Sequence, residues 1–485
     1  MTGGWQADRD VSASDTIFAL SSGGGRAGVA VVRISGPNAG PALAALLTGS
    51  RLDSADSDSS TSSDGSSDGV TPAPATAPLR PAPAPRALQR ANLFDAEGGL
   101  LDEGMAVWFP GPNSFTGEDV VELHVHGSPA VVRAVLARLG QLDGLRPAEA
   151  GEFTQRAFLR GKLDLAAVEG LGDLIDAQTE AQRRLSLRQL GGALSQQVEE
   201  WRSDIIALRA ETEAWIDFPD EDLPEDFFPT VRARAGALAA EMASRTEASH
   251  RLAAQVRDGF SVALVGLPNV GKSSLLNALA ARDVAIVTDI AGTTRDTISV
   301  PVDLGGFLVN FVDTAGLRET SDTIEALGVD RARQAAEQAD LVLWLVDERG
   351  EAPEIAASLD QARVLRVATK QDLWRASPDT TGQQAAPLGV SVVTGEGLQA
   401  VLDAVQAAVL GQGGSLDALL PMGRERHAFH VGAAVAALQQ AQAQDELALL
   451  AECMREASAA LGRITGAVDV EDVLDHIFSR FCIGK

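Results

Sequence analysis

The stretch FSVALVGLPNVGKSS, residues 260–274, reads as a buried strand, a glycine-containing loop and the start of a helix. Its loop, GLPNVGKS, matches the G-x-x-x-x-G-K-[ST] pattern of the P-loop. In a P-loop, backbone N–H groups and a helix N-terminus surround phosphate groups, a lysine meets the β and γ oxygens, and a hydroxyl binds Mg²⁺. We therefore predict a phosphate site in which Lys272 and Ser273 have these two roles.

Further apolar runs follow the P-loop and alternate with helical segments as far as residue 412. They are FLVNFVD (307–313), LVLWLV (341–346) and VLRVATK (364–370). Strands that alternate with helices are typical of a mostly parallel sheet with helices on both faces. We predict an α/β domain of this kind over residues 256–412.

Helices are predicted on both sides of the α/β domain. Apolar residues such as Val198, Trp201 and Ile205 recur at helical spacing between residues 162 and 215, and Gly191 with Gly192 marks a break. The pattern is helical again after residue 412, so the α/β domain is predicted to be inserted into a helical bundle. The core candidates of the second helical part are Leu447, Leu449, Leu450 and Leu461.

The N-terminal part reads as an α+β domain. The strand-like run VAVVRISG precedes an Ala/Leu-rich helix, and strand-like runs resume with GMAVWFPGP and VVELHVHG. Between them, residues 53–86 are rich in Ser, Asp, Pro and Ala, a composition that buries too little apolar surface to fold. The predicted domains are 1–147 with this disordered loop, 148–255 and 413–485 as the two helical halves, and 256–412.

Composition narrows the class of protein. The formal net charge of −27 argues against broad, non-specific nucleic-acid binding, which requires clustered Lys and Arg. No run approaches the roughly 18 uncharged apolar residues that a membrane span needs, and the N-terminus lacks the pattern of a signal peptide. Two cysteines in 485 residues cannot form a disulfide framework. We expect a cytosolic protein with no membrane partner.

Three stretches after the P-loop indicate which nucleotide binds. DIAGTTRD (289–296) offers Thr294 to Mg²⁺, and VDTAG (312–316) ends a strand with Asp313 near the metal and Gly316 near the γ-phosphate. TKQD (369–372) offers the Asp372 carboxylate, which can accept two hydrogen bonds from a guanine edge but not from adenine. We predict a Ras-like GTPase whose GTP-binding residues are Asn269, Val270, Gly271, Lys272, Ser273, Ser274, Thr288, Asp289, Ile290, Ala291, Gly292, Thr293, Thr294, Asp313, Thr314, Ala315, Gly316, Thr369, Lys370, Asp372 and Ser391.

The residue that follows DTAG is Leu317, where a catalytic glutamine would orient the attacking water. An apolar side chain cannot do this, so catalysis has to come from elsewhere. Asn269 could help to hold a monovalent cation where an arginine finger would otherwise lie, and Glu325 could orient the water.

Several segments together resemble the MnmE (TrmE) family of tRNA wobble-uridine modification GTPases. They are NSFTGEDVVELHVHG (113–127), FLRGKLDLAAVEGL (158–171), WIDFPDED (215–222), GLPNVGKSSLLNAL (266–279), AIVTDIAGTTRD (285–296), DTAGLRETSD (313–322) and the terminal FCIGK (481–485). They occur in the family's order and cover nearly the whole chain except residues 50–90.

The resemblance implies a fold, an activity and partners. It implies a folate-binding N-terminal domain that forms homodimers, a helical domain and an inserted GTPase domain. It also implies a heterotetramer with the flavoprotein MnmG, which carries FAD. This complex would use GTP, Mg²⁺, K⁺ and a 5-formyl- or 5,10-methylene-tetrahydrofolate to add an aminomethyl-type group to C5 of the wobble uridine of certain tRNAs.

The resemblance also implies roles for individual residues. Mg²⁺ falls to Ser273 and Thr294, and the water-orienting acid to Glu325. The remaining assignments are K⁺ at Asn269, Thr288, Ile290 and Thr293, and folate at Arg33, Glu122, Lys162 and Lys485.

Cys482 lies near the end of the chain in FSRFCIGK (478–485). Gly484 and Lys485 fit a prenylation signal poorly. The resemblance implies a tail that folds back toward the folate pocket, where Cys482 acts either chemically or only as part of the structure.

Two other functions remain open from the sequence. The first is a ribosome-assembly GTPase that acts as a timed binding module. The second is a folate-dependent aminomethyl-transfer protein in which the GTPase domain is only structural. Binding of a reduced folate would argue against the first, and nucleotide turnover would argue against the second.

Overall fold

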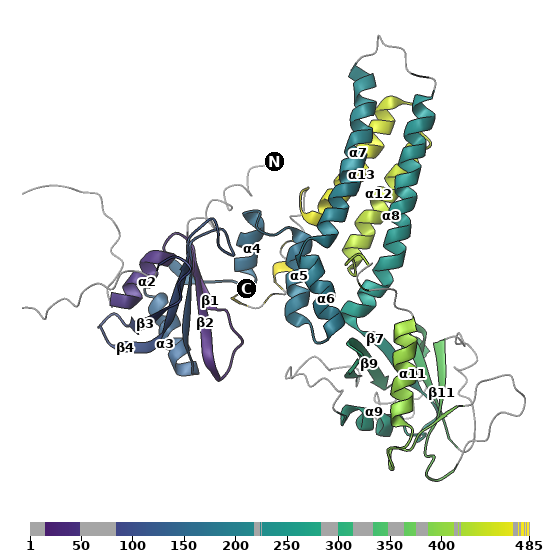
Figure 1. Cartoon of the computed structure of the whole chain (residues 1–485), viewed down its shortest axis with the longest axis horizontal. Coiled ribbons are helices and arrows are strands. Elements are labelled where there is room, and N and C mark those ends of the chain that lie inside the picture. The colour runs from purple at the N-terminus through teal and green to yellow at the C-terminus, as the bar shows by residue number, and fades with distance from the viewer. Residues whose placement is uncertain are drawn as a thin grey trace, which may run out of the picture. The chain divides into compact units, whose positions relative to one another are not determined.

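The structure is a computed structural model (Figure 1), and it divides into two compact units, Met1–Val168 with Asp469–Lys485, and Glu169–Val468. Each unit is described by itself. The residues that the structure describes are 15–48, 84–217, 224, 226–282, 299–313, 333–347, 363–374, 387–411, 416, 419–468, 474, 477–479, 481 and 483–484.

The first unit contains a six-stranded sheet with the order β3-β4-β5-β2-β1-β6. Its neighbouring strands are antiparallel except β1 and β6, which are parallel. The strands are β1 (Thr16–Leu20), β2 (Ala27–Ser35), β3 (Gln89–Phe94), β4 (Leu100–Phe109), β5 (Val120–Gly127) and β6 (Leu145–Pro147).

The two faces of this sheet differ because side chains alternate along each strand. One face packs against α2 (Ala39–Thr48) and α3 (Pro129–Leu139), and its core includes Val32 and Leu123, both fully buried. Each of these residues is next in sequence to a charged one, Arg33 or Glu122, which therefore lies on the opposite face. Arg33 and Glu122 are direct partners in the β2–β5 register. The helix α4 (Glu152–Leu159) completes the described helices of this unit before α5 (Leu165–Asp176).

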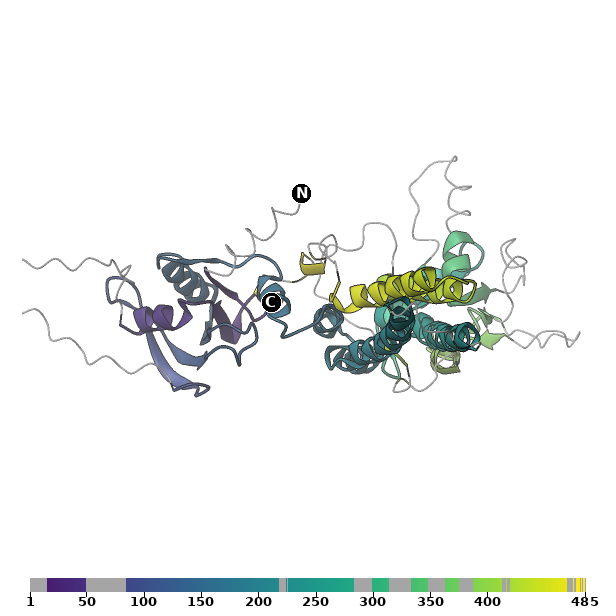
Figure 2. The same ribbon diagram turned by 90° about the horizontal axis from the view of Figure 1, so that it is seen from above.

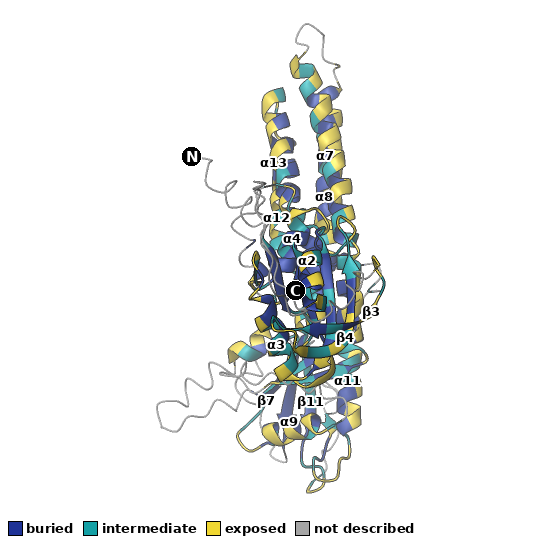
Figure 3. Ribbon diagram, turned by 90° about the vertical axis from the view of Figure 1, so that its left-hand side faces the viewer, coloured by how far each residue is buried: buried dark blue, intermediate teal, exposed yellow. Residues whose placement is uncertain are grey.

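Long helices form a bundle in the second unit. The bundle contains α6 (Glu180–Leu190), α7 (Ala193–Asp217), α8 (Phe227–Asp258), α12 (Glu425–Ala441) and α13 (Leu447–Thr465). Figures 1 and 2 show α7, α8, α12 and α13 side by side, and Figure 3 shows buried stripes along the long helices with exposed residues on the outside. The predicted break is confirmed, since Gly191 caps the C-terminus of one helix and the next begins at Ala193.

One of the predicted core residues of α13 is wrong. Leu450 and Leu461 are fully buried, but Leu449 is 47% exposed. An α-helix turns by about 100° per residue, so the neighbour of a buried residue points well away from the core. Leu449, next to the buried Leu450, therefore points away from the core.

The second sheet has the order β12-β11-β10-β7-β9-β8, and all its pairs are parallel except β8–β9. The predicted α/β fold is confirmed, although the antiparallel β8 was not expected. Its elements are β7 (Phe260–Val265), α9 (Lys272–Ala280), β8 (Ser299–Leu304), β9 (Phe307–Asp313), β10 (Leu341–Val346), β11 (Val364–Ala368), β12 (Leu388–Gly389) and α11 (Leu398–Gly411).

The helical bundle and this sheet share one hydrophobic core. Ala181 and Leu185 of α6 pack in the same cluster as Phe260 and the apolar residues of α9 and α11. The N–H of Ala181 also donates to the Gly306 carbonyl at the β8–β9 turn, at 2.9 Å. None of the helices described by the structure has the length and apolar character that crossing a membrane requires.

Candidate functional site

The P-loop joins the C-terminal end of β7 to the N-terminus of α9. Gly266 has to be glycine, because a Cβ there would lie 2.7 Å from the Leu345 carbonyl oxygen. Gly271, which caps α9, has a φ of 109°. Asn269 lies between them with a φ of 64°, a left-handed conformation that asparagine tolerates better than most residues. The sequence thus forms the tight loop that a phosphate site requires.

Lys272, the first residue of α9, is buried, with 7% of its surface exposed. Its Nζ donates to the carbonyl oxygens of Gly266, at 2.7 Å, and Leu267, at 2.9 Å. A buried ammonium group needs such partners, because burying a charge without them is costly. These bonds hold the positive charge inside the loop, where the predicted phosphates would bind.

The structure brings together two residues that the sequence associated with Mg²⁺. The Ser273 hydroxyl donates to Oδ2 of Asp313 at 2.7 Å. Asp313 is 1% exposed and ends β9, which pairs with β7 next to the P-loop. Hydroxyl and carboxylate oxygens are hard ligands of the kind that Mg²⁺ prefers, so the side chains present fit this ion.

The segment TKQD is tied to the P-loop. The buried Thr369 donates its hydroxyl hydrogen to the Val270 carbonyl at 2.6 Å, and Lys370 Nζ donates to the Asn269 carbonyl at 2.8 Å. A threonine hydroxyl has only one hydrogen to donate. Thr369 therefore positions this segment against the P-loop, and recognition of a base is left to other groups.

Asp372 and Ser391, from two separate loops, also come together. The Ser391 hydroxyl donates to Oδ1 of Asp372 at 2.7 Å and fixes the orientation of the carboxylate. Asp372 is exposed, and within the described part of the chain its carboxylate accepts no other side-chain bond. It can therefore accept hydrogen bonds from a bound base.

Several predicted site residues lie outside the residues that the structure describes. They are the K⁺ and Mg²⁺ segment 288–294, residues 314–316 after Asp313, Glu325, Cys482 and Lys485.

A second group of predicted residues comes together in the first unit. Nε and Nη2 of Arg33 both donate to Oε1 of Glu122, at 3.0 and 2.9 Å. The Arg33 guanidinium also lies 5.2 Å from the ring centre of Phe115 and 5.8 Å from that of Phe153. Both charged side chains are about one-fifth exposed, so a ligand can reach them.

Within the residues that the structure describes, Oε2 of Glu122 accepts no hydrogen bond. Nε2 of His124 lies 3.8 Å from it, which is too long for a hydrogen bond. Nε2 of His124 is itself buried without a partner in the described part of the chain. The site therefore has a carboxylate oxygen that a ligand could bind, beside a buried imidazole nitrogen. Phe115 and Phe153 were not predicted to lie at this site, because they belong to two distant segments.

The loop 113–119, which carries Phe115, also lies next to Lys162. Lys162 is exposed, and a Cβ on Gly117 would lie 3.4 Å from the Lys162 Cε, so its side chain runs past this loop. The structure thus places Lys162 beside the segment that carries Phe115.

The C-terminal tail docks on the first unit. Ile483 forms an antiparallel bridge with Ala150, and the Gly484 carbonyl accepts a hydrogen bond from the Ser21 hydroxyl at 2.8 Å. A Cβ on Gly484 would lie only 2.1 Å from the Leu20 carbonyl oxygen, so only glycine fits there. The implied return of the tail to this unit therefore has a specific contact.

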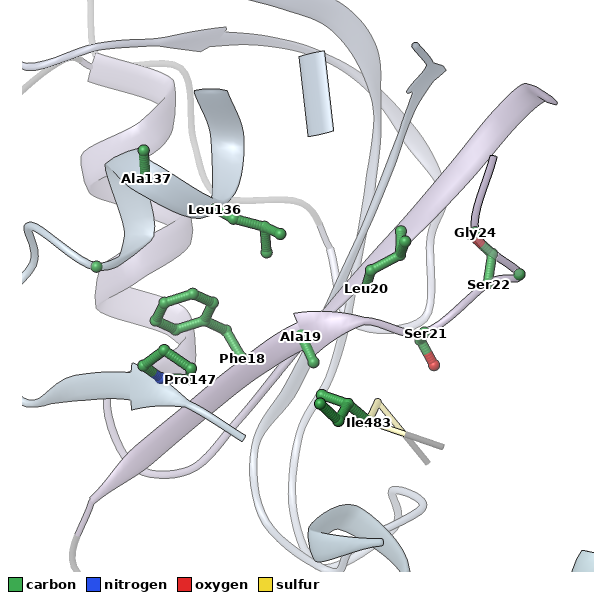
Figure 4. A pocket seen from close by; sticks show the side chains of 12 residues that line it. Phe18, Ala19, Leu20, Ser21, Ser22, Gly24, Leu136, Ala137, Pro147 and Ile483 are labelled. Carbon is green, nitrogen blue, oxygen red and sulfur yellow. The ribbon is translucent and has the colours of Figure 1, made fainter. Parts of the chain in front are cut away.

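Ile483 also lines a cavity of about 650 Å³. Figure 4 shows Phe18, Leu136 and Ile483 around it, from β1, α3 and the tail. The lining is mostly apolar. The cavity is close to the predicted folate residues, since Ala19 lines it and is the direct register partner of Arg33. This cavity was not predicted, because its lining residues come from segments far apart in the chain.

The fold and the P-loop define a class, the P-loop nucleotide-binding proteins with a Ras-like α/β domain, here joined to a helical bundle and an α+β domain. Two family models match, the MnmE helical domain over residues 165–482 and the GTP-binding protein TrmE N-terminus over residues 16–162. The chain belongs to the MnmE family of tRNA modification GTPases.

Curated relatives match over nearly their whole length. The tRNA modification GTPase MnmE of Rhodospirillum rubrum is 50% identical over 97% of this chain and 99% of its own, and that of Methylorubrum populi is 47% identical over 97% and 98%. Among solved structures, a variant of Era from Aquifex aeolicus bound to GDP and AlF4⁻ is similar at 26% identity, over 30% of this chain and 56% of that one, with a TM-score of 0.24.

Proposed function

We propose that the chain is a K⁺-dependent GTP hydrolase that modifies C5 of the wobble uridine of certain tRNAs with a one-carbon unit from a tetrahydrofolate. It would act as a homodimer, in the cytoplasm, in a heterotetramer with the flavoprotein MnmG that carries FAD. The observation that carries this proposal is the Arg33–Glu122 pair. It is a partly exposed ion pair in a unit separate from the P-loop, and a protein that only binds and hydrolyses GTP would not need a ligand site there.

The proposed nucleotide roles follow from the contacts of the second unit. Lys272, held by two loop carbonyls, would exchange them for phosphate oxygens and so keep its charge paired throughout binding. Ser273 and Thr294 would hold Mg²⁺, with Asp313 behind them, and this ion supplies charge neutralisation at the phosphates when bound. Asp372 would read the guanine edge.

The proposed folate roles follow from charge and hydrogen bonding. A pterin has neighbouring N–H groups that can donate hydrogen bonds to a carboxylate. Oε2 of Glu122 would accept them. The polyanionic tail of a folate favours cations, and Lys162 and Lys485 would supply these. Arg33 would hold the Glu122 carboxylate in place through its two hydrogen bonds.

The tRNA site is expected to depend on the partner protein. Arg183, one of the arginines that could contact tRNA, is paired with Glu180 through two hydrogen bonds of 2.7 Å. Together with the net charge of −27, this supports a tRNA site to which the flavoprotein contributes much of the positive surface.

Calorimetric titration with 5-formyltetrahydrofolate tests the proposed folate site. We expect the wild-type chain to bind, and Glu122→Gln to bind at least about tenfold more weakly, because hydrogen bonds to a charged group contribute about 1.5–3 kcal/mol. The matched control is Glu103→Gln, which breaks an exposed pair with Arg90 on the same sheet. A wild-type chain that binds no reduced folate would favour the timed binding module instead.

GTP hydrolysis in K⁺ and in Na⁺, at equal ionic strength and with ATP as the control nucleotide, tests the cation site. We expect K⁺ to raise the rate by about tenfold or more, since an arginine finger at this place contributes 10³–10⁵. In Asn269→Gly the stimulation by K⁺ should vanish. Glycine is the suitable variant because it adopts the φ of 64° without strain. Equal rates of the wild type in both salts would exclude K⁺ dependence.

A further inference from the structure

Glu118 is a buried carboxylate at which three segments of the first unit meet. It is 6% exposed, yet three side chains donate to it. Ser35 Oγ on β2 donates to Oε2 at 2.8 Å, Arg156 Nη1 on α4 to Oε2 at 3.1 Å, and Arg160 Nη2 to Oε1 at 2.8 Å. Neither the P-loop nor the Arg33–Glu122 pair uses Glu118 directly. The density of its contacts therefore requires another explanation.

The same residue closes the loop that it ends. The Glu118 carbonyl accepts a hydrogen bond from Ser114 Oγ, and its N–H donates to Thr116 Oγ1. Because the single hydrogen of Ser35 Oγ goes to Glu118, the contact of 2.7 Å between Ser35 and Thr116 is a bond donated by Thr116. The segment 114–118 is thus fixed at both ends and in the middle.

This loop and the start of α4 carry the side chains around Arg33 and Glu122, the proposed folate-binding residues. Phe115 presents its ring to the Arg33 guanidinium, and Phe153, in the first turn of α4, presents the second ring. Gly117 has a φ of 78°, and the Lys162 side chain passes beside it. A Cβ at position 117 would lie only 3.4 Å from the Lys162 Cε, so glycine leaves room for this side chain. Glu118 binds both the loop and α4, so it determines how the two rings are spaced around Arg33.

Among the described residues, the charged groups around Glu118 balance one another. Three carboxylates (Asp15, Glu118 and Glu152) face three guanidinium groups (Arg146, Arg156 and Arg160). Burial alone would raise the pKa of Glu152, but hydrogen bonds from Arg146 and Arg156 bring the pKa below its ordinary value. The carboxylates and guanidinium groups therefore neutralise one another. Removing the charge of one carboxylate would leave the buried Arg156 with too few partners.

We propose that Glu118 is the positioning residue of the folate site. It fixes the 114–118 loop against α4, so that Phe115 and Phe153 hold Arg33 beside Glu122 and Gly117 gives Lys162 its path. This inference rests on the proposed folate function of these residues. It does not make Glu118 a ligand, because its side chain is enclosed by its own partners.

The comparison of Glu118→Gln with Glu152→Gln separates positioning from stability. Both residues are about equally buried and both pair with Arg156, but Glu152 makes no bond to the 114–118 loop in the described part of the chain. We expect similar losses in melting temperature. Only Glu118→Gln should weaken 5-formyltetrahydrofolate binding, by about tenfold or more, because small displacements of supporting residues are costly at a preorganised site. Equal weakening in both variants would overturn the proposal.

A second measurement does not need the ligand. The ¹⁵N resonance of Arg33 Nε, assigned with an Arg33→Lys variant, reports the hydrogen bond to Glu122. It should shift or broaden in Glu118→Gln and stay unchanged in Glu152→Gln. An unchanged resonance in Glu118→Gln would overturn the positioning role, even if the chain bound no folate. If the wild type bound no folate but the Arg33 resonance still shifted in Glu118→Gln, only the proposed folate function would be contradicted, and the positioning role would stand.

Discussion

Replacing Asp372 by asparagine is expected to lower the affinity for GTP by roughly 10²- to 10⁴-fold and to transfer the preference to xanthosine triphosphate. The carboxylate would accept two hydrogen bonds from guanine, and bonds to a charged group contribute about 1.5–3 kcal/mol each. An asparagine presents an N–H₂ group to the donor groups of guanine. Xanthine carries a carbonyl oxygen where guanine carries its amino group, so it satisfies the new donor.

The measurement is kcat/KM for GTP and for xanthosine triphosphate. Asp403→Asn is the matched control, because Asp403 is an exposed aspartate of α11 in the same domain, bonded to Gln399. It should leave both values as in the wild type. If Asp372→Asn hydrolysed GTP at the wild-type rate, the TKQD segment would not be the guanine reader, and the tie between Thr369 and Val270 would be only structural.

The nucleotide site was predictable because its chemistry is local in the sequence. The P-loop is one contiguous stretch, and its glycines and lysine are required where they stand by the backbone and the phosphates. The partners Ser273 and Asp313 are 40 residues apart. They were still predictable, since parallel strands bring their C-terminal ends to one edge of the sheet.

Short antiparallel elements were harder to predict than the parallel sheet. β1 and β3 were missed because they are short. TIFAL is a nearly apolar run of five residues, and QRANLF is half polar, so neither shows a clear alternation. β8 was missed although the apolar residues of SVPVDL alternate, because the run is only six residues long and contains Pro301, which argues against a strand. The pairing of such strands depends on their neighbours in the sheet.

The first-unit site depends on long-range register. Arg33 and Glu122 are 89 residues apart, and only the family resemblance suggested that they act together. Glu118 lay within a stretch that carried the resemblance, but its partners Ser35 and Arg156 are 83 and 38 residues away. Nothing local distinguishes such a buried hub from an ordinary surface glutamate.

Glu169→Gln is the second change with a large expected effect, this time on the stability of the helical bundle. Glu169 is 4% exposed, and its carboxylate binds His427 Nε2 at 2.7 Å and Arg426 Nη2 at 2.9 Å. Removing one partner of a buried ion pair costs about 3–5 kcal/mol, because the other charge stays buried. Hydrogen exchange of α12 amides should accelerate by roughly 10²- to 10⁴-fold, because the exchange rate rises about tenfold for each 1.4 kcal/mol lost from the opening free energy.

The same pair makes the bundle acid-sensitive. Burial alone would raise the pKa of Glu169, but His427 and Arg426 lower it to about 2, and burial lowers the pKa of His427. A carboxyl with a lowered folded-state pKa stabilises fully above its unfolded pKa and loses this as the pH falls toward 2. For His427, the unfolded chain takes up a proton below about pH 6.5 that the folded chain resists, so stability again falls on acidification.

Protection factors of α12 measured from pH 7 to about pH 3 test both effects, since the contribution of His427 falls below about pH 6.5 and that of Glu169 below its ordinary pKa of 4.5. In the wild type the protection factors should fall as the pH falls. In Glu169→Gln they should be lower at pH 7, and the part of the pH dependence that comes from the Glu169 carboxyl should be absent. The matched control is Glu452→Gln on α13, which breaks an exposed pair with Arg455 and should leave protection unchanged. If the two variants behaved alike, the buried pair would contribute no more than a surface one. The bundle would then owe its stability to its apolar stripe alone, with Arg426 finding compensation from the Arg463 and Ile464 carbonyls that it already contacts.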